Sequence, residues 1–155
     1  MRSAMIFAGV VMGLSCSVAV MAQEKGRWRP LSTTSLGITG GVAFSNETLS
    51  MNFLKFPIAE IRDLTPGELI AIALGDPMGK DAAVSGHLYR LSIPATQRFL
   101  NRNTMCGGDE TQWMTTAVRG KTLQLAFFST AQMPVLTAEA LANTTNLCGT
   151  FSYMR

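Results

Sequence analysis

The chain of 155 residues contains a single histidine, His87, and lacks both paired histidines and a Cys-x-x-Cys motif. A histidine-based metal site needs several such ligands, so we expect no metal and no other cofactor. A Ser-His-acid triad needs an imidazole as its base, and only His87 can supply one. We therefore expect a protein that is not an enzyme. The alternative is a hydrolase that uses His87.

Long runs of like charge are also missing. The formal net charge is +3, and no block of five or six like charges occurs. Such blocks are typical of nucleic-acid stripes and polybasic membrane patches, so neither partner is expected. The densest basic segment contains Lys25, Arg27 and Arg29, and we expect it to be a frayed, solvated tail.

The first 22 residues have the pattern of a secretory signal peptide. A charged start at Arg2 is followed by the apolar stretch 4–20 and by a small-residue exit at Ala22. Small residues dilute this stretch, so we expect cleavage after Ala22 and no stable membrane insertion afterwards. The mature chain would be periplasmic or secreted. A lipid anchor on Cys16 is the competing interpretation, because the two residues before it resemble part of a lipobox.

The remaining residues, 23–155, are of ordinary single-domain size. They retain 12 Lys and Arg against 10 Asp and Glu, a net charge of about +2. Two cysteines remain, Cys106 and Cys148, and an oxidising compartment favours their pairing. Closing this loop stabilises the fold by roughly 4 kcal/mol in the chain-entropy model.

Turn signals every eight to twelve residues predict a mainly β fold. We expect a single antiparallel β-barrel or sandwich of seven to eight strands with one or two short helices. The expected strands cover residues 35–39, 42–44, 49–53, 58–64, 87–93, 112–118, 121–128 and 147–154. A helical turn is expected over residues 95–100, and a short helix over 138–142.

The segment 65–74 is ambiguous. Thr65, Pro66 and Glu68 have the offsets of a capping box with proline at the first helical position, which favours a helix. Alternation of apolar residues over 70–74 favours a strand instead. We favour the strand, because short apolar runs in a β-rich neighbourhood are more often strands.

Residues 75–86 are polar and glycine-rich, and are expected to form the longest surface loop. Our candidates for contact with a partner are their three charged residues, Asp76, Lys80 and Asp81, together with the adjacent His87. The glycine spacing and the aspartate after Lys80 do not match a phosphate-binding loop.

Gly26, Arg27 and Trp28 match the Gly-x-Trp start of lipocalins, in which the tryptophan closes one end of a ligand-holding barrel. This resemblance implies a carrier of a small apolar ligand. Such a carrier would contain an internal cavity lined by residues such as Phe53, Trp113 and Phe127.

A second resemblance covers the second half of the chain. Its features are a tyrosine-arginine strand at 88–90, an Asn-Thr-x-Cys-Gly turn at 103–107 and a closing segment at 147–153. The pattern resembles small exported bacterial proteins with one disulfide. It implies a disulfide-linked β fold and no particular activity. The architecture is similar, more loosely, to periplasmic lysozyme and protease inhibitors.

Together these features favour a non-catalytic binding protein of the cell envelope. Its partner would be a protein, and its role that of an inhibitor or immunity-type partner of an envelope enzyme. Either the loop 75–86 or the loop 130–136 is the expected docking surface. Because lysozymes are usually basic, a mature charge of about +2 offers little electrostatic steering toward them. The alternatives are the lipocalin-like carrier and the hydrolase that uses His87.

Overall fold

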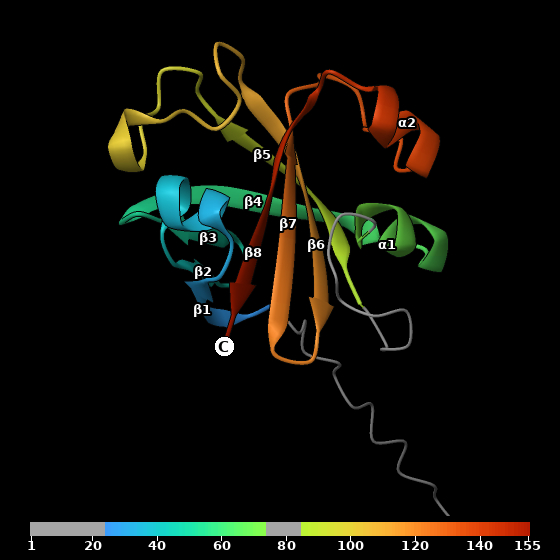
Figure 1. The fold of residues 1–155 in the computed structure, drawn as a ribbon, viewed down its shortest axis with the longest axis horizontal. Coiled ribbons are helices and arrows are strands. Elements are labelled where there is room, and N and C mark those ends of the chain that lie inside the picture. Colours follow the sequence, from blue (N-terminus) through green and yellow to red (C-terminus); the bar gives the residue numbers. More distant parts are fainter. Residues whose placement is uncertain (1–23, 74–84) are drawn as a thin grey trace, which may run out of the picture.

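The computed structural model describes residues 24–73 and 85–155. In these residues eight antiparallel strands form a closed barrel, in which each strand pairs with its sequence neighbours and the last pairs with the first (Figure 1). The strands are β1 (Gly26–Pro30), β2 (Val42–Phe44), β3 (Thr48–Met51), β4 (Leu54–Asp63), β5 (His87–Ile93), β6 (Thr111–Arg119), β7 (Thr122–Phe128) and β8 (Leu147–Met154). The expected fold is confirmed, and it is a barrel rather than a sandwich.

Large side chains fill the barrel interior. Trp28, Phe127, Phe151 and Tyr153 are fully buried there, and the rings of Phe127 and Phe151 meet edge to face at 5.3 Å. This cluster takes its members from every strand, as the alternation in β5, β7 and β8 predicts. Trp113 does not point into the barrel, so its predicted place in an internal cavity lining is wrong.

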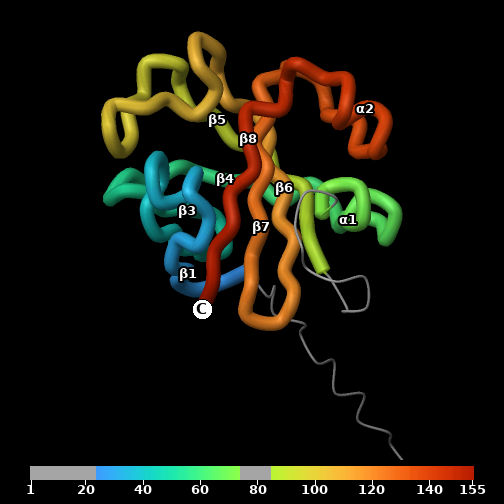
Figure 2. Tube along the Cα trace, viewed as in Figure 1, coloured from blue at the N-terminus to red at the C-terminus, as the bar shows by residue number. Residues whose placement is uncertain are grey.

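A second apolar cluster lies outside the barrel. The helices α1 (Pro66–Ala73) and α2 (Ala138–Asn143) contact each other on one side of the molecule (Figure 2). Residues of α1 and of the segment leading into α2 cover the outward face of β5, β6 and β7. The buried members of this cluster are Leu64, Leu69, Ile72, Leu88, Trp113, Ala117, Ala126, Phe128 and Leu136.

Helix α1 corrects the favoured interpretation of residues 65–74 as a strand. The backbone N–H of Glu68 donates to Thr65 Oγ1 at 3.3 Å, and the N–H of Thr65 donates to Glu68 Oε2 at 2.9 Å. This reciprocal capping box satisfies backbone donors at the helix start. The apparent alternation has no structural meaning here, because Ile70 is exposed while its neighbours Leu69 and Ala71 are buried.

Residues 35–39 are not a strand either. They form the π-helical turn η1 (Ser35–Thr39), which closes with the N–H of Gly40 donating to the carbonyl of Ser35 at 2.8 Å. The Ser35 hydroxyl lies 2.9 Å from the carbonyl oxygen of Ser152 in β8, which fixes the turn to the barrel. Local hydroxyl bonds of this kind compete with strand pairing.

The expected frayed tail is also wrong. Residues 26–30 form β1, which pairs with β2 and β8 and so completes the barrel. Only the side chains of Arg27 and Arg29 are exposed. Pro30 is the last residue of this short strand.

Strand β4 begins at Leu54, four residues before the expected start. Pro57 lies inside it because the strand changes partner at this point: Pro57 pairs with Thr48 of β3, and Ile58 pairs with Leu91 of β5. Further on, the expected helical turn over 95–100 is wrong: residues 95–96 form a turn, and the short helix η2 (Leu100–Arg102) begins only at the last of these residues. The β6–β7 hairpin, α2 and β8 follow the sequence predictions to within one or two residues.

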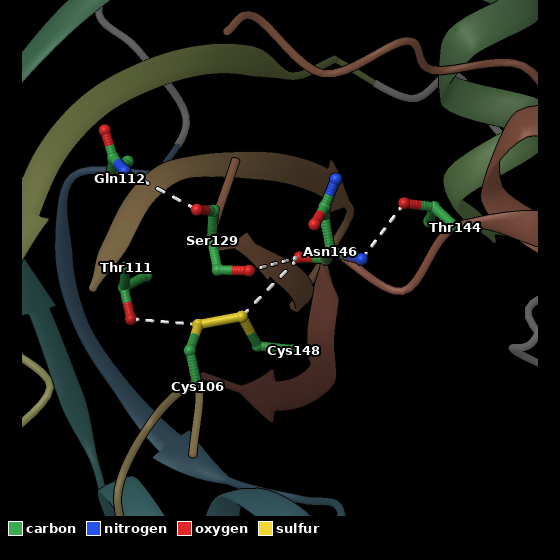
Figure 3. The surroundings of a disulfide bond; sticks show 7 residues. All are labelled: Cys106, Thr111, Gln112, Ser129, Thr144, Asn146 and Cys148. Atoms are coloured by element: carbon green, nitrogen blue, oxygen red, sulfur yellow. Dashed lines mark hydrogen bonds between the residues drawn. A yellow bond between two sulfur atoms is a disulfide. The ribbon is translucent and has the colours of Figure 1, made fainter. Parts of the chain in front are cut away.

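The predicted disulfide is confirmed. Cys106 and Cys148 are bonded across a Cα–Cα distance of 4.8 Å, and the Thr111 hydroxyl donates to the sulfur of Cys106 at 3.0 Å (Figure 3). Both cysteines pack against the interior cluster. The bond fastens the long connection 94–110 to the start of β8.

Because successive strands run in opposite directions, their connections fall at two ends. We name the end that holds Glu24, His87 and Arg155 the terminal end. The opposite end, the loop end, holds the connections 31–41, 52–53, 94–110 and 129–146. No helix in the described part of the chain has the length and apolar character needed to cross a membrane.

Candidate functional site

His87 occupies the first position of β5, at the rim of the terminal end. Its backbone N–H donates to Thr116 Oγ1 of β6 at 3.0 Å. The preceding Gly86 lies so close to β6 that a Cβ atom there would come within 2.0 Å of the Thr116 carbonyl oxygen. Only glycine allows this approach. The close packing of Gly86 and the hydrogen bond from the His87 N–H therefore fix the backbone that carries the imidazole.

Glu24 lies against one side of this imidazole. It precedes β1, and Trp28 Nε1 donates to its carbonyl oxygen at 2.7 Å, which holds the segment in place. The residue is only 1% exposed. Its Oε1 accepts a hydrogen bond from the Thr116 hydroxyl at 2.7 Å and contacts Nδ1 of His87. Its Oε2 is buried and, among the described residues, has no hydrogen-bond partner.

Two further carboxylates lie on the other side of the ring. Asp63, the last residue of β4, places Oδ1 3.1 Å from Nε2 of His87, although its side chain is 85% exposed. Glu60 lies near them, and ligand atoms of Glu60, Asp63 and His87 all lie within 4.8 Å of one another. The expected rim histidine is therefore confirmed in position, and carboxylates contact both of its ring nitrogens.

The hydroxyl of Tyr89 lies next to these negatively charged carboxylates. It donates a long hydrogen bond of 3.5 Å to Glu60 Oε2. Burial raises the pKa of Tyr89 well above its ordinary value, and the negative charges of Glu24 and Glu60 raise this pKa further. Three carboxylates thus surround one imidazole at the terminal end.

The arrangement does not pair an attacking hydroxyl with the imidazole. The Thr116 hydroxyl bonds Glu24, and in the described residues no serine or threonine hydroxyl bonds a ring nitrogen of His87. A general base activates a nucleophile by direct hydrogen bonding to it. Two other carboxylates are engaged elsewhere: Glu68 binds Arg62, and Glu110 accepts a hydrogen bond from the Ser92 hydroxyl.

Trp28 is buried in the barrel interior and is covered by the side chain of Arg155. Its ring is 2% exposed and lies beneath the guanidinium of Arg155, 4.1 Å away. Arg155 also donates to the carbonyl oxygen of Lys25. These contacts join the segment before β1 to the last residue of the chain.

The loop end presents a different feature. Phe53 and Asn52 connect β3 to β4 with φ angles of 65° and 48°. Two consecutive positive values define the two-residue hairpin turn in which Asn-Gly is the preferred pair. A phenylalanine in this conformation costs about 1–2 kcal/mol. Phe53 is nonetheless fully exposed, so its predicted place in a half-buried strand and in a cavity lining is wrong.

The neighbouring connection 94–110 is held firmly in place. Its Phe99 is buried against Phe56 of β4, with ring centroids 6.0 Å apart. Asn101 and Asn103 donate to the carbonyl oxygen of Gly37 in η1, at 3.1 and 3.2 Å. Asn101 and the following Arg102 again have positive φ values, of 54° and 61°. The non-glycine residues of positive φ in the described chain thus all lie at the loop end.

The loop end carries charges of both signs. Lys55 follows the turn in β4, and Arg98 and Arg102 lie in the connection 94–110; all three side chains are exposed. Asp109 and Glu110 also lie in that connection, and Glu139 lies in 129–146. Exposed Leu36 in η1 adds apolar surface at this end.

Other predicted partner residues have different outcomes. Asp76, Lys80 and Asp81 lie outside the described residues, as do the predicted signal peptide and Cys16. In the predicted docking loop 130–136, Met133 and Val135 are exposed, whereas Leu136 is buried in the outer cluster. Glu24, Glu60 and the exposed position of Phe53 were not predicted from the sequence. The sequence signal for this turn was Asn52, which precedes an aromatic residue and lies between two runs of alternating apolar residues.

Comparisons of the chain with protein-family models, with curated proteins and with solved structures gave no significant match.

Proposed function

We propose that the protein is a non-catalytic binding protein that inserts Phe53 into an apolar pocket of a protein partner. The observation that carries this proposal is the full exposure of Phe53 in a left-handed turn conformation. Glycine would remove the backbone cost at this position. A bulky aromatic side chain that is costly and buries nothing within its own chain is best explained by burial in another molecule.

The surroundings of Phe53 fit an anchor of this kind. Energetic hot spots of protein interfaces are commonly aromatic residues surrounded by less important contacts. A two-residue turn between paired strands holds the ring with little freedom, and the adjacent connection is held by the disulfide and by the contacts with Gly37. A rigid surface loses little entropy on binding.

Lys55 is exposed and lies two residues after the anchor. It would face an acidic side chain at the rim of the apolar pocket, which would steer association. Because lysozymes are usually basic, this positive charge favours another partner. In keeping with the signal pattern and the disulfide, we place the mature protein in the periplasm or outside the cell, as an inhibitor or immunity-type partner of an envelope enzyme.

The experiment compares three purified baits in native envelope extract: the wild type, Phe53→Gly and Val135→Ala. Val135 is the matched control, since it is apolar, exposed and part of the other predicted docking loop. A captured protein counts as the partner only if it binds the wild type directly after purification. We expect Phe53→Gly alone to lose it. If Val135→Ala lost the partner and Phe53→Gly retained it, the interface would lie at loop 130–136 and the proposal would be overturned.

A further inference from the structure

We propose that Nε2 of His87 and the carboxylates of Asp63 and Glu60 bind a Zn²⁺ ion at the terminal end of the barrel. Their ligand atoms all lie within 4.8 Å of one another. Zinc bonds to nitrogen and oxygen of about 2.0–2.2 Å place tetrahedral ligands roughly 3.5 Å apart. Asp63 and Glu60 are exposed, so rotation of their side chains can close this difference.

A β-bulge brings the two carboxylates to one side of β4. Residues three apart in a regular strand point to opposite faces. The pairing of β4 with β5 shifts register between Glu60 and Arg62, so that Glu60 pairs with Tyr89 and Asp63 pairs with His87. The extra residue, Ile61, resets the alternation. Bulges often aim side chains at functional sites in this manner.

Glu24 supplies the independent observation that points to a metal ligand. Its buried carboxylate contacts Nδ1 of His87, and the Thr116 hydroxyl holds it there. A proton on Nδ1 satisfies this contact and leaves the Nε2 lone pair directed toward Asp63. Metal-bound histidines usually donate their other ring N–H to a carboxylate, which fixes the tautomer and raises ligand basicity.

The two ring contacts require either a metal ion or a second proton beside Nε2. A neutral imidazole has one N–H and cannot donate to both Glu24 and Asp63. With the proton on Nδ1, the lone pair of Nε2 faces Asp63 Oδ1 at 3.1 Å, and two acceptors oppose each other. A divalent ion between them resolves this conflict. A second proton on the ring is the competing occupant.

The donor set selects among divalent ions. Imidazole favours zinc and its transition-metal neighbours, whereas Ca²⁺ and Mg²⁺ prefer sites made entirely of oxygen. One imidazole and two carboxylates leave a fourth position for water, which reaches the site because Asp63 is exposed. The ligands follow no spacing motif, so this site could not be predicted from the sequence.

The test uses the full mature chain, oxidised, without a histidine tag and stripped of metal with a chelator. Calorimetric titration with ZnCl₂ should show one ion bound per chain at micromolar concentrations, with MgCl₂ giving no binding in that range. Asp63→Asn and Glu60→Gln should each weaken Zn²⁺ binding at least tenfold. Asp109→Asn removes an exposed carboxylate at the loop end and should leave affinity unchanged.

A nitrogen NMR spectrum of the single imidazole separates the two occupants. Zinc should shift the Nε2 resonance of His87 while Nδ1 keeps its proton. An Nε2 that stays protonated at neutral pH with Zn²⁺ present would identify the proton as the occupant and overturn the proposal. Equal affinity of wild type, Asp63→Asn and Glu60→Gln would also overturn it. Phe53→Gly should retain Zn²⁺ binding, so failure of the proposed function leaves this test unaffected.

Discussion

The guanidinium of Arg155 lies 4.1 Å from the centre of the Trp28 ring and so joins the last residue of the chain to the first strand of the barrel. The seam between β1 and β8 is short: Arg29 pairs with Met154, and Pro30 pairs with Tyr153. Arg155 extends this seam, because its side chain donates to the carbonyl oxygen of Lys25. The Arg155 side chain therefore adds two contacts to a short seam.

Arg155→Ala should lower the free energy of unfolding by about 1–2 kcal/mol. The variant loses a cation–π contact over a buried ring and a charged hydrogen bond. Urea unfolding followed by circular dichroism measures the change. Arg27→Ala, an exposed arginine of β1, is the control and should change stability by less than about 0.5 kcal/mol. Equal effects of the two substitutions would contradict a closing role for Arg155.

Reduction of the disulfide should cost about 4 kcal/mol of unfolding free energy, because Cys106 and Cys148 close a loop with a sequence separation of 42 residues. Urea unfolding with and without reductant measures this cost. The double variant Cys106→Ser with Cys148→Ser should match the reduced wild type and show no response to reductant. A response of the double variant would trace the effect to something other than this bond.

Glu68 should make stability depend on acid pH. Its hydrogen bond with Arg62 is the main cause that lowers its pKa from 4.5 to about 2. The folded state therefore favours the charged carboxylate, whose contribution is complete above pH 4.5 and is lost as the pH falls toward 2. Because both partners are partly exposed, we expect about 1 kcal/mol. The stability difference between wild type and Glu68→Gln should shrink across this range, and a constant difference would refute the assignment.

Local patterns predicted most strands because their side chains alternate between the filled interior and the outside. The β6–β7 hairpin and β8 illustrate this, since Leu123, Leu125 and Phe151 all point inward as expected. The pattern failed where a side chain bonds to the backbone. Ser35 turns residues 35–39 into a helical turn, and the Thr65–Glu68 capping box starts a helix where alternation favoured a strand.

The candidate sites were less predictable than the fold. Glu24 reaches His87 only because the barrel closes, and their separation of 63 residues gives no local signal. The bulge near Ile61 changes which carboxylates share a face with the imidazole. Phe53 continues the alternation of Leu49 and Met51, so only the geometry of the turn reveals that it is exposed.

Phe53→Gly should raise the free energy of unfolding by about 0.5–1 kcal/mol. Relief of the left-handed conformation gains about 1–2 kcal/mol, and the flexibility of glycine in the unfolded chain offsets part of this. Urea unfolding measures the difference. Val135→Ala serves as the control, because it also removes exposed apolar surface but leaves the turn unchanged. A loss of stability in Phe53→Gly would mean that the ring supports the fold.

The central claim is that Phe53 is kept for a partner at a cost to stability. Its most direct test is the dissociation constant of the purified partner for wild type and for Phe53→Gly, measured by calorimetry with both proteins folded. We predict at least about 30-fold weaker binding by the variant, the effect of a hot spot of 2 kcal/mol or more. Binding within about twofold of wild type, by a variant that is as stable or more stable, would contradict the claim.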